Sequence, residues 1–218
     1  MKHGFVKVAA ATPDIKVADC IYNAQSICSD MKKAAEQGAK IVVFPELCLT
    51  GYTCSDLFWQ ERMLDAAKEG LRKIIKTSLT LDGLFFVGLP WEVNQKLYNV
   101  AAAVSNGELL GLVPKKYLPN YAEFYEARHF TPGKEDVEWV TFDGQEVPFG
   151  MHQQFHCAEV PGLIVAAEIC EDLWVPNPPS VAAAMAGATV IVNLSASNEN
   201  TGKSLYRTAL VQNQSARL

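Results

Sequence analysis

The sequence contains no apolar run that approaches the roughly 18 residues needed to cross a bilayer. It also has no excess of basic residues, because 24 aspartates and glutamates outnumber 19 lysines and arginines and give a net charge of −5. A chain without a basic face matches neither nucleic acid nor an anionic membrane surface. Residues 1–4 lead into an apolar stretch without a small-residue cleavage site, so we expect no signal peptide. These absences predict a cytoplasmic protein without nucleic-acid or membrane partners.

Closely spaced cysteine pairs are also absent. The chain has six cysteines but no CxxC pair, and its 49% hydrophobic content is that of a core-forming protein, not of a small disulfide-stapled one. Cys20 and Cys28 fall on the apolar stripe of a predicted helix, as core residues do. His152 and His156 stand near Cys157, but no fourth ligand lies close by, so we expect no metal site.

Strands and helices alternate along the chain and indicate one α/β domain over residues 1–218. Strands are predicted at 5–11, 41–44, 84–89, 99–105, 109–113, 163–169 and 189–194, and helices at 17–35, 61–79, 180–186 and 203–218. The pair Asn106-Gly107 predicts a two-residue hairpin, and short antiparallel strands are expected within 134–154. This mixture favours a layered fold with mixed sheets. The last helix has no glycine or proline stop signal, so we expect a C-terminally truncated fragment.

Three polar or reactive side chains stand just after apolar strands. Cys170 ends the run 163–169, Glu46 follows 41–44, and Lys115 follows 109–113. The ends of strands are where α/β sheets place reacting groups. Each residue alone is ambiguous, since a free cysteine is often a core residue and the charges could be solvated. Together they supply a base, a cation that stabilises an oxyanion, and a nucleophile, which is the set that acyl transfer requires.

The motifs around these residues resemble the nitrilase (carbon–nitrogen hydrolase) superfamily, and more closely the glutaminase domain of glutamine-dependent NAD⁺ synthetases. The matching segments are Phe44-Pro45-Glu46-Leu47, Pro114-Lys115-Lys116-Tyr117-Leu118-Pro119, Asn120-Tyr121-Ala122-Glu123-Phe124-Tyr125-Glu126, Glu168-Ile169-Cys170-Glu171-Asp172-Leu173-Trp174, and Asn193-Leu194-Ser195-Ala196-Ser197. Further matches at Lys203 and 214–217 extend the resemblance over nearly the whole chain.

The resemblance implies an αββα sandwich and a Glu–Lys–Cys triad. Glu46 would be the general base, Lys115 would stabilise the tetrahedral intermediate, and Cys170 would be the nucleophile. Lys116 is the rival for the lysine role. The backbone N–H of Glu171, the residue after the nucleophile, is a natural second oxyanion donor.

The resemblance also implies which residues contact L-glutamine. These are Tyr121, Ser197 and Lys203, with Tyr52, Glu171 and Trp174 as weaker candidates. A cation such as Lys203 suits the α-carboxylate, and Glu171 could face the ammonium group. The alternatives are that Tyr121 and Trp174 only pack the pocket wall and that Lys203 is solvated. The roles of Glu123 and Glu126 remain open: they could include an auxiliary carboxylate near the lysine, or they could pair with Arg128 at the surface.

The expected function is glutamine hydrolysis through a cysteine thioester, with the ammonia used to amidate deamido-NAD⁺. A synthetase domain of the same full-length chain would perform that ligase step, and ATP and Mg²⁺ belong to it. Neither GxxxxGK[ST] nor GxGxxG occurs in these 218 residues, so no cofactor is expected for this domain. A homo-oligomer is expected by analogy. The alternatives are a free-standing amidase for another small amide, and a catalytically silent fragment that serves assembly.

Overall fold

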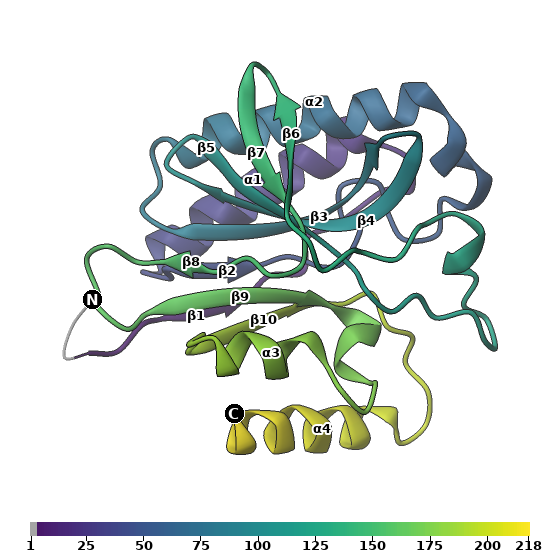
Figure 1. The fold of residues 1–218 in the computed structure, drawn as a ribbon. Helices are drawn as coiled ribbons and strands as arrows, with labels where there is room; N and C mark the ends of the chain where they lie inside the picture. Colours follow the sequence, from purple (N-terminus) through teal and green to yellow (C-terminus); the bar gives the residue numbers. More distant parts are fainter. Residues whose placement is uncertain (1–3) are drawn as a thin grey trace.

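Two β-sheets pack face to face, and a pair of helices covers the outer face of each (Figure 1). The structure is a computed structural model that describes residues 4–218. Part of the signal-peptide expectation rests on residues 1–3, which lie outside the described residues. Within 4–218, no helix combines the length and the apolar character that crossing a membrane requires.

The larger sheet has seven strands. Their spatial order is β1 (Val8–Ala10), β2 (Ile41–Val43), β3 (Leu84–Val93), β4 (Lys96–Ser105), β5 (Glu108–Pro114), β7 (Gln145–Phe149) and β6 (Glu138–Phe142). Strands β1 to β3 run parallel, whereas β3, β4 and β5 form two consecutive antiparallel hairpins. The predicted Asn106-Gly107 turn joins β4 to β5, and both residues have positive φ, as a type I′ turn requires.

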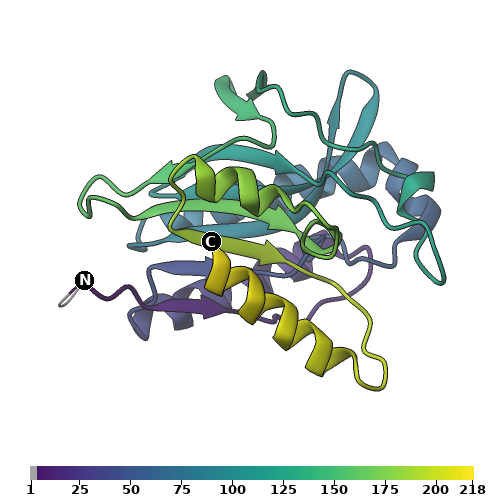
Figure 2. The same cartoon turned by 60° about the horizontal axis from the view of Figure 1, so that its bottom comes forward.

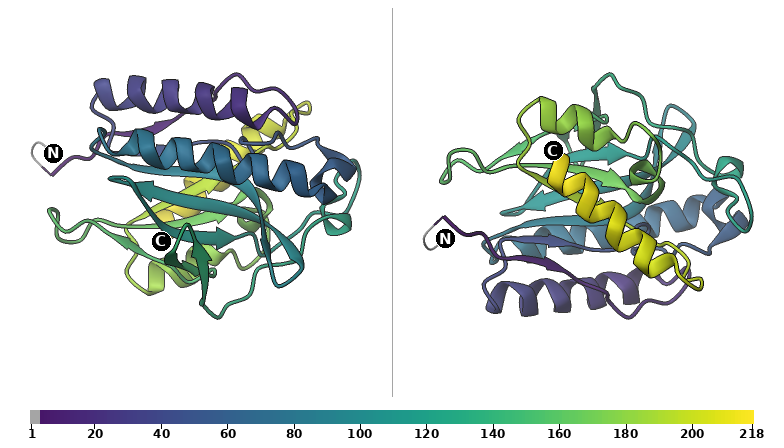
Figure 3. Two further views of the ribbon diagram at one scale, coloured as in Figure 1. Left: turned by 90° about the horizontal axis from the view of Figure 1, so that it is seen from above. Right: turned by 90° about the horizontal axis from the view of Figure 1, so that it is seen from below.

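The smaller sheet has three strands in the order β10 (Val190–Leu194), β9 (Ile164–Ile169) and β8 (Phe155–His156). Strands β9 and β10 are parallel, so their carboxyl ends lie together at one edge. Helices α3 (Pro179–Met185) and α4 (Lys203–Arg217) cover its outer face (Figure 2). Helices α1 (Cys20–Glu36) and α2 (Glu61–Ser78) lie side by side over the larger sheet (Figure 3).

The alternation of side chains along the strands divides the core into two layers. Phe85 and Val87 of β3 face α1 and α2, where they pack with Ile27 and Leu71. Phe86, between them in sequence, faces the other way and packs between the sheets, where the buried neighbours include Ala101, Ala103, Val165, Ala167 and Val192. The layers therefore follow the order helix, sheet, sheet, helix, and the predicted αββα fold with mixed sheets is confirmed.

The element boundaries differ from the sequence-based ones in several places. Strand β1 is shorter than expected and β3 is longer, because β3 continues through Pro90 to a second tight hairpin at Asn94-Gln95, where both residues have positive φ. The helix predicted over 61–79 ends one residue earlier, at Ser78, and Leu79 is 59% exposed.

Candidate active site

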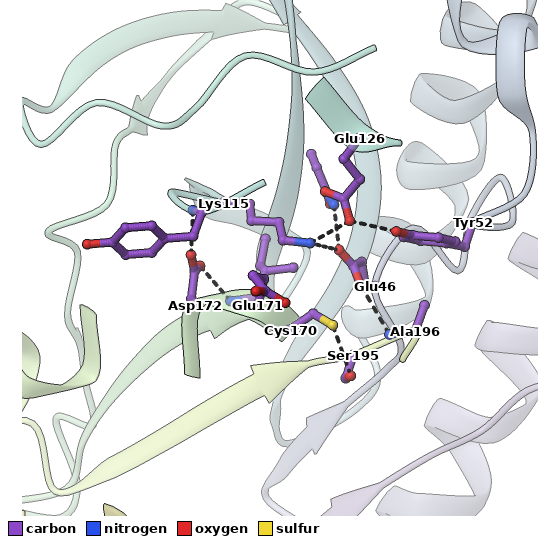
Figure 4. A network of polar contacts seen from close by, with 12 residues as sticks. Glu46, Tyr52, Lys115, Glu126, Cys170, Glu171, Asp172, Ser195 and Ala196 are labelled. Carbon is purple, nitrogen blue, oxygen red and sulfur yellow. Dashed lines mark hydrogen bonds and ion pairs between the residues drawn. The ribbon is translucent and has the colours of Figure 1, made fainter. Parts of the chain in front are cut away.

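The three residues that follow apolar strands lie together between the sheets (Figure 4). Lys115 comes directly after β5, Cys170 directly after β9, and Glu46 three residues after β2. Their exposed fractions are 1% for Glu46, 1% for Lys115 and 6% for Cys170. A buried lysine and glutamate are costly unless they are paired. The sequence therefore predicted correctly which strand ends meet.

Glu46 and Lys115 form a buried ion pair. The Lys115 Nζ lies 2.6 Å from Glu46 Oε1, which also accepts a hydrogen bond of 2.7 Å from Asn99 Nδ2. The other carboxylate oxygen, Oε2, accepts the backbone N–H of Ala196 at 3.1 Å. Three donors thus fix the Glu46 carboxylate in one orientation, and two of them, Asn99 and Ala196, are residues that sequence analysis did not single out.

Glu126 is the second carboxylate of this centre. Its Oε1 lies 2.7 Å from the Lys115 Nζ and accepts the Tyr52 hydroxyl at 2.7 Å. Burial, followed by the negative charge of Glu46, raises the pKa of Glu126 to about 7 despite the opposing effect of Lys115. Arg128 pairs with Asp56 instead. Of the two alternatives for Glu126, the geometry therefore shows the carboxylate beside the lysine and not the surface partner of Arg128.

Burial by itself would lower the pKa of the Lys115 ammonium. The negative charges of Glu46 and then of Glu126 outweigh burial, so the net pKa of Lys115 is raised. Lys115 therefore stays charged at neutral pH. The adjacent Lys116 lies away from this centre, since its ammonium pairs with Glu135 at 2.8 Å. The geometry thus favours Lys115 over its rival.

Cys170 stands at a sharp turn from β9 into the 3₁₀ helix η3 (Cys170–Leu173). Its φ is 45°, a left-handed conformation that is costly for a residue other than glycine. The Ser195 hydroxyl donates to its sulfur at 3.3 Å. Burial, and then the charge of Glu46, raises the pKa of the Cys170 thiol to about 12, against the opposing effect of Lys115. The resting sulfur is therefore a neutral thiol.

Asp172 joins the turn that carries Cys170 to the loop that carries Lys115. Its Oδ1 accepts the backbone N–H groups of Lys116 and Tyr117 at 3.1 and 2.8 Å, and its Oδ2 accepts that of Ile169 at 3.0 Å. Asp172 is 2% exposed. One carboxylate therefore fixes the distance between two loops that lie 55 residues apart in the sequence.

Gly88 of β3 allows the turn around Glu46 to approach the sheet. A Cβ at this position would lie 2.3 Å from the Leu47 nitrogen and 2.6 Å from the Pro45 oxygen. The carbonyl of Gly88 accepts the Leu49 N–H at 3.1 Å. Backbone packs directly against backbone here, which only glycine permits.

A pocket of about 330 Å³ opens over Cys170. Its size is at the lower end of small-molecule sites, which span roughly 300–1,000 Å³. Five of the six predicted substrate-contact residues line it, together with Glu123, Phe124 and Asn198; the five are Tyr121, Glu171, Trp174, Ser197 and Lys203. The sixth, Tyr52, lies apart from this lining, because its hydroxyl is bound to Glu126.

The pocket wall carries charges of both signs. The Lys203 ammonium lies 5.3 Å from the ring centre of Trp174 and 5.6 Å from that of Phe124, and it donates to Asn198. Glu171 accepts the Tyr121 hydroxyl at 3.0 Å, and Glu123 accepts the Asn198 amide. Such a wall suits a small zwitterion. Among residues 4–218, no group of three or more His, Cys, Asp or Glu side chains has the arrangement of a metal site.

The chain was compared with known protein families, curated proteins and solved structures. The carbon–nitrogen hydrolase family model matches residues 7–217. A glutamine-dependent NAD(+) synthetase from Mycobacterium tuberculosis (strain H37Rv) is 40% identical over 216 residues, which are 99% of this chain and 32% of the relative. The chain thus spans about a third of the length of such curated relatives.

Two solved structures show the same fold. A glutamine-dependent NAD(+) synthetase from Cytophaga hutchinsonii has a TM-score of 0.83 at 29% identity, over 94% of this chain and 33% of that one. An amidase from Nesterenkonia sp. has a TM-score of 0.73 at 21% identity, over 98% of this chain and 73% of that one, and this likeness concerns the fold alone. The family match over residues 7–217 decides the classification: the chain belongs to the carbon–nitrogen hydrolase family.

Proposed function

We propose that this chain is the glutaminase domain of a glutamine-dependent NAD⁺ synthetase and that it releases ammonia from L-glutamine. The observation that carries the proposal is the buried Glu46–Lys115 ion pair beside the thiol of Cys170, under a pocket with charges of both signs. The 40% identity to a named NAD(+) synthetase along 99% of the chain supports the choice of glutamine over other amides.

In the proposed reaction Glu46 takes the proton of the Cys170 thiol, and the sulfur attacks the side-chain carbonyl carbon of glutamine. Lys115 and the backbone N–H of Glu171 stabilise the negative oxygen that forms. The carbon–nitrogen bond then breaks, and the nitrogen leaves as ammonia with the proton that Glu46 returns. Water attacks the resulting γ-glutamyl thioester, and glutamate leaves while the sulfur regains a proton.

We assign the α-carboxylate of glutamine to Lys203 and its α-ammonium to Glu171, with Tyr121, Ser197 and Trp174 along the side chain. A site that binds both groups favours glutamine over simple amides, because a simple amide lacks the two charges that Lys203 and Glu171 would bind. Tyr52 takes a different role here, since it orients Glu126 beside the lysine.

The wider setting is part of the proposal. Residues 1–218 would form the glutaminase domain of a longer cytoplasmic chain whose synthetase domain receives the ammonia and holds ATP and Mg²⁺, while this domain needs no cofactor. A homo-oligomer is proposed as well, and sedimentation velocity tests it. Met185, Leu205 and Tyr206 on α3 and α4 are exposed apolar side chains that such contacts could use.

The test is to measure the release of glutamate and ammonia from L-glutamine, with propionamide and L-asparagine as competitors for the assignment. We expect glutamine to be the preferred substrate, and we expect Cys170→Ala to lower turnover by at least about 10⁴-fold without changing the circular dichroism spectrum. Turnover of propionamide but not of glutamine would instead identify an amidase of different specificity. Retained glutamine turnover in Cys170→Ala would refute the mechanism.

A further inference from the structure

A further buried carboxylate lies behind the nucleophile, on the face of the smaller sheet that α3 and α4 cover. Glu168 of β9 is 2% exposed, and the parallel register places Asn193 of β10 directly beside it. Its Oε1 accepts Asn193 Nδ2 at 3.3 Å, and its Oε2 accepts the backbone N–H of Ser180 at 3.0 Å. In the described part of the chain Glu168 thus has hydrogen-bond donors but no cationic partner. The proposed reaction gives this carboxylate no chemical role.

The pair formed by Glu168 and Asn193 reaches the nucleophile from the side opposite to Lys115. Asn193 Nδ2, which donates to Glu168, also lies 3.5 Å from the Cys170 carbonyl oxygen. Two residues later in the chain, Ser195 donates to the Cys170 sulfur. The end of β10 and the residue Ser195 just after it therefore contact both the backbone and the side chain of a residue whose strained φ of 45° persists only where neighbours hold it.

The same polar chain continues outward to the last helix. Ser180 Oγ accepts Gln214 Nε2 at 2.9 Å, and Gln214 is the buried residue of α4. A cavity of about 470 Å³ lies next to this contact, lined by Val211 and Gln214 of α4 and by Glu168 and Asn193 of the sheet. Because apolar packing under α4 is incomplete, the hydrogen bond of Gln214 is a specific link between this helix and the sheet.

We propose that Glu168 and Asn193 are positioning residues that hold Cys170 in its left-handed conformation, and that Ser180 and Gln214 make this arrangement depend on how α4 is docked. Glu168 orients the Asn193 amide so that its N–H groups face the Glu168 carboxylate and the Cys170 carbonyl. The inference rests on the proposed function only in taking Cys170 as the nucleophile.

The experiment measures the rate at which iodoacetamide alkylates Cys170 between pH 7 and 10, by peptide mass spectrometry. Alkylation needs no glutamine turnover, so a chain that failed as a glutaminase would still test this inference. Cys20, buried at 2% exposure in α1, reports global unfolding in the same digest. We expect Glu168→Gln to slow alkylation of Cys170 roughly tenfold and to shift its pH profile, because small misplacements of a reacting group have large effects on rate. Cys20 should stay protected.

The matched control is Glu159→Gln, the same exchange at an exposed glutamate, and it should leave the alkylation rate of Cys170 unchanged.

The double variant Glu168→Gln with Asn193→Asp separates an effect on the position of Cys170 from an effect on stability. Its amide and carboxylate exchange places, so the cross-strand hydrogen bond can reform, but residue 193 no longer donates to the Cys170 carbonyl. We expect its melting temperature to recover and its slow alkylation to persist.

Two outcomes would overturn the inference: a wild-type rate and profile in folded Glu168→Gln, or recovery of both stability and rate in the double variant. If Glu168→Gln alone does not fold, the double variant decides.

The link to α4 is tested by comparing two single variants, Gln214→Ala and Gln212→Ala. Gln212 is an exposed neighbour on the same helix. A lower Cys170 rate only in Gln214→Ala supports the link to α4, and equal rates would contradict that part.

Discussion

At the scale of single residues, the centre holds two carboxylates, Glu46 and Glu126, against one ammonium. Three hydrogen-bond donors fix Glu46 and two reach Glu126, whose Oε2 is buried without a partner in the described structure. Burial raises the pKa of Glu126 to about 7, so Glu126 binds a proton more readily than an ordinary glutamate does.

Glu46 and Lys115 shift the pKa of the Cys170 thiol in opposite directions, so replacing one or the other should change the alkylation rate of Cys170 in opposite directions. Glu46→Gln removes a charge that raises the pKa of Cys170, so alkylation of Cys170 at pH 9 should become faster even though glutamine hydrolysis is lost. Lys115→Met removes a charge that lowers this pKa, so alkylation should become slower. Labelling of Cys20 again reports unfolding, and a change of the same sign in both variants would contradict the account.

Glu126 predicts how stability depends on pH. Its pKa is about 7 in the folded chain and about 4.5 in an unfolded one, so between these values the folded state binds more protons. The stability from this group is therefore complete below pH 4.5 and is lost as the pH rises through 7, by at most about 1.4 kcal/mol per pH unit. Urea unfolding between pH 5 and 8 should show this decline.

The variant Glu126→Gln should flatten that decline, because an amide does not titrate, whereas the exposed Glu159→Gln should leave it intact. If the wild type and Glu126→Gln had parallel curves of stability against pH, the assignment of the raised pKa to Glu126 would be wrong.

At the scale of single residues, the sequence predicted the three side chains at strand ends. It did not predict the roles of Asn99, which belongs to no motif, or of Ser195, which lies in a matching segment, because their contacts depend on how distant strands align.

At the scale of elements, tight turns determine where the reacting groups lie. The chain has to turn sharply at Glu46 and at Cys170, and it does so with φ of 51° at Leu47 and 45° at Cys170. Gly88 of β3 makes room for the first turn, and Asp172 of η3 ties the second turn to the loop that carries Lys115. The positions of the reacting side chains therefore depend on the backbone geometry of these turns.

Gly88→Ala tests this dependence. The added methyl group would meet the backbone of Pro45 to Leu47, so the Glu46 turn has to shift, and overpacking of this kind costs roughly 1–3 kcal/mol. We expect glutamine turnover to fall by about 100-fold. Gly38→Ala is the control, because Gly38 lies at the end of α1 with free space around it; unlike Gly88 it has positive φ, so the exchange strains only the local backbone. It should cost stability and leave turnover per folded molecule unchanged. Equal turnover in both variants would contradict the role of Gly88.

Local signals explain which elements could be predicted. The Asn106-Gly107 turn was predicted because glycine accepts positive φ without strain. The turn at Asn94-Gln95 was missed because glutamine is rare at such a position, and the neighbouring strands impose the conformation. The end of α2 was predicted one residue late, because the helix ends at Ser78 and leaves Leu79 exposed beyond it. Where the backbone preference is local the sequence suffices, and where packing overrides it the sequence does not.

At the scale of the whole molecule, the two sheets bring the site together. The larger sheet supplies the loops of Glu46 and Lys115, the smaller sheet supplies Cys170 and Ser195, and the loops that follow β5, β9 and β10 line the pocket. Hydrophobic periodicity predicted the strands but not which sheet each one joins, because pairing is a property of the folded chain. The αββα arrangement was predicted from the resemblance of the motifs, and the loop-to-loop contact of Asp172 was not predicted at all.

The measurement that tests the central claim most directly is covalent labelling with 6-diazo-5-oxo-L-norleucine, a reactive glutamine mimic, followed by intact mass and peptide mapping. The account predicts a single adduct on Cys170 that excess L-glutamine prevents, and no adduct in Cys170→Ala. Labelling of another cysteine, or labelling of Cys170 that glutamine does not slow, would contradict the claim that this pocket binds glutamine over a nucleophilic Cys170.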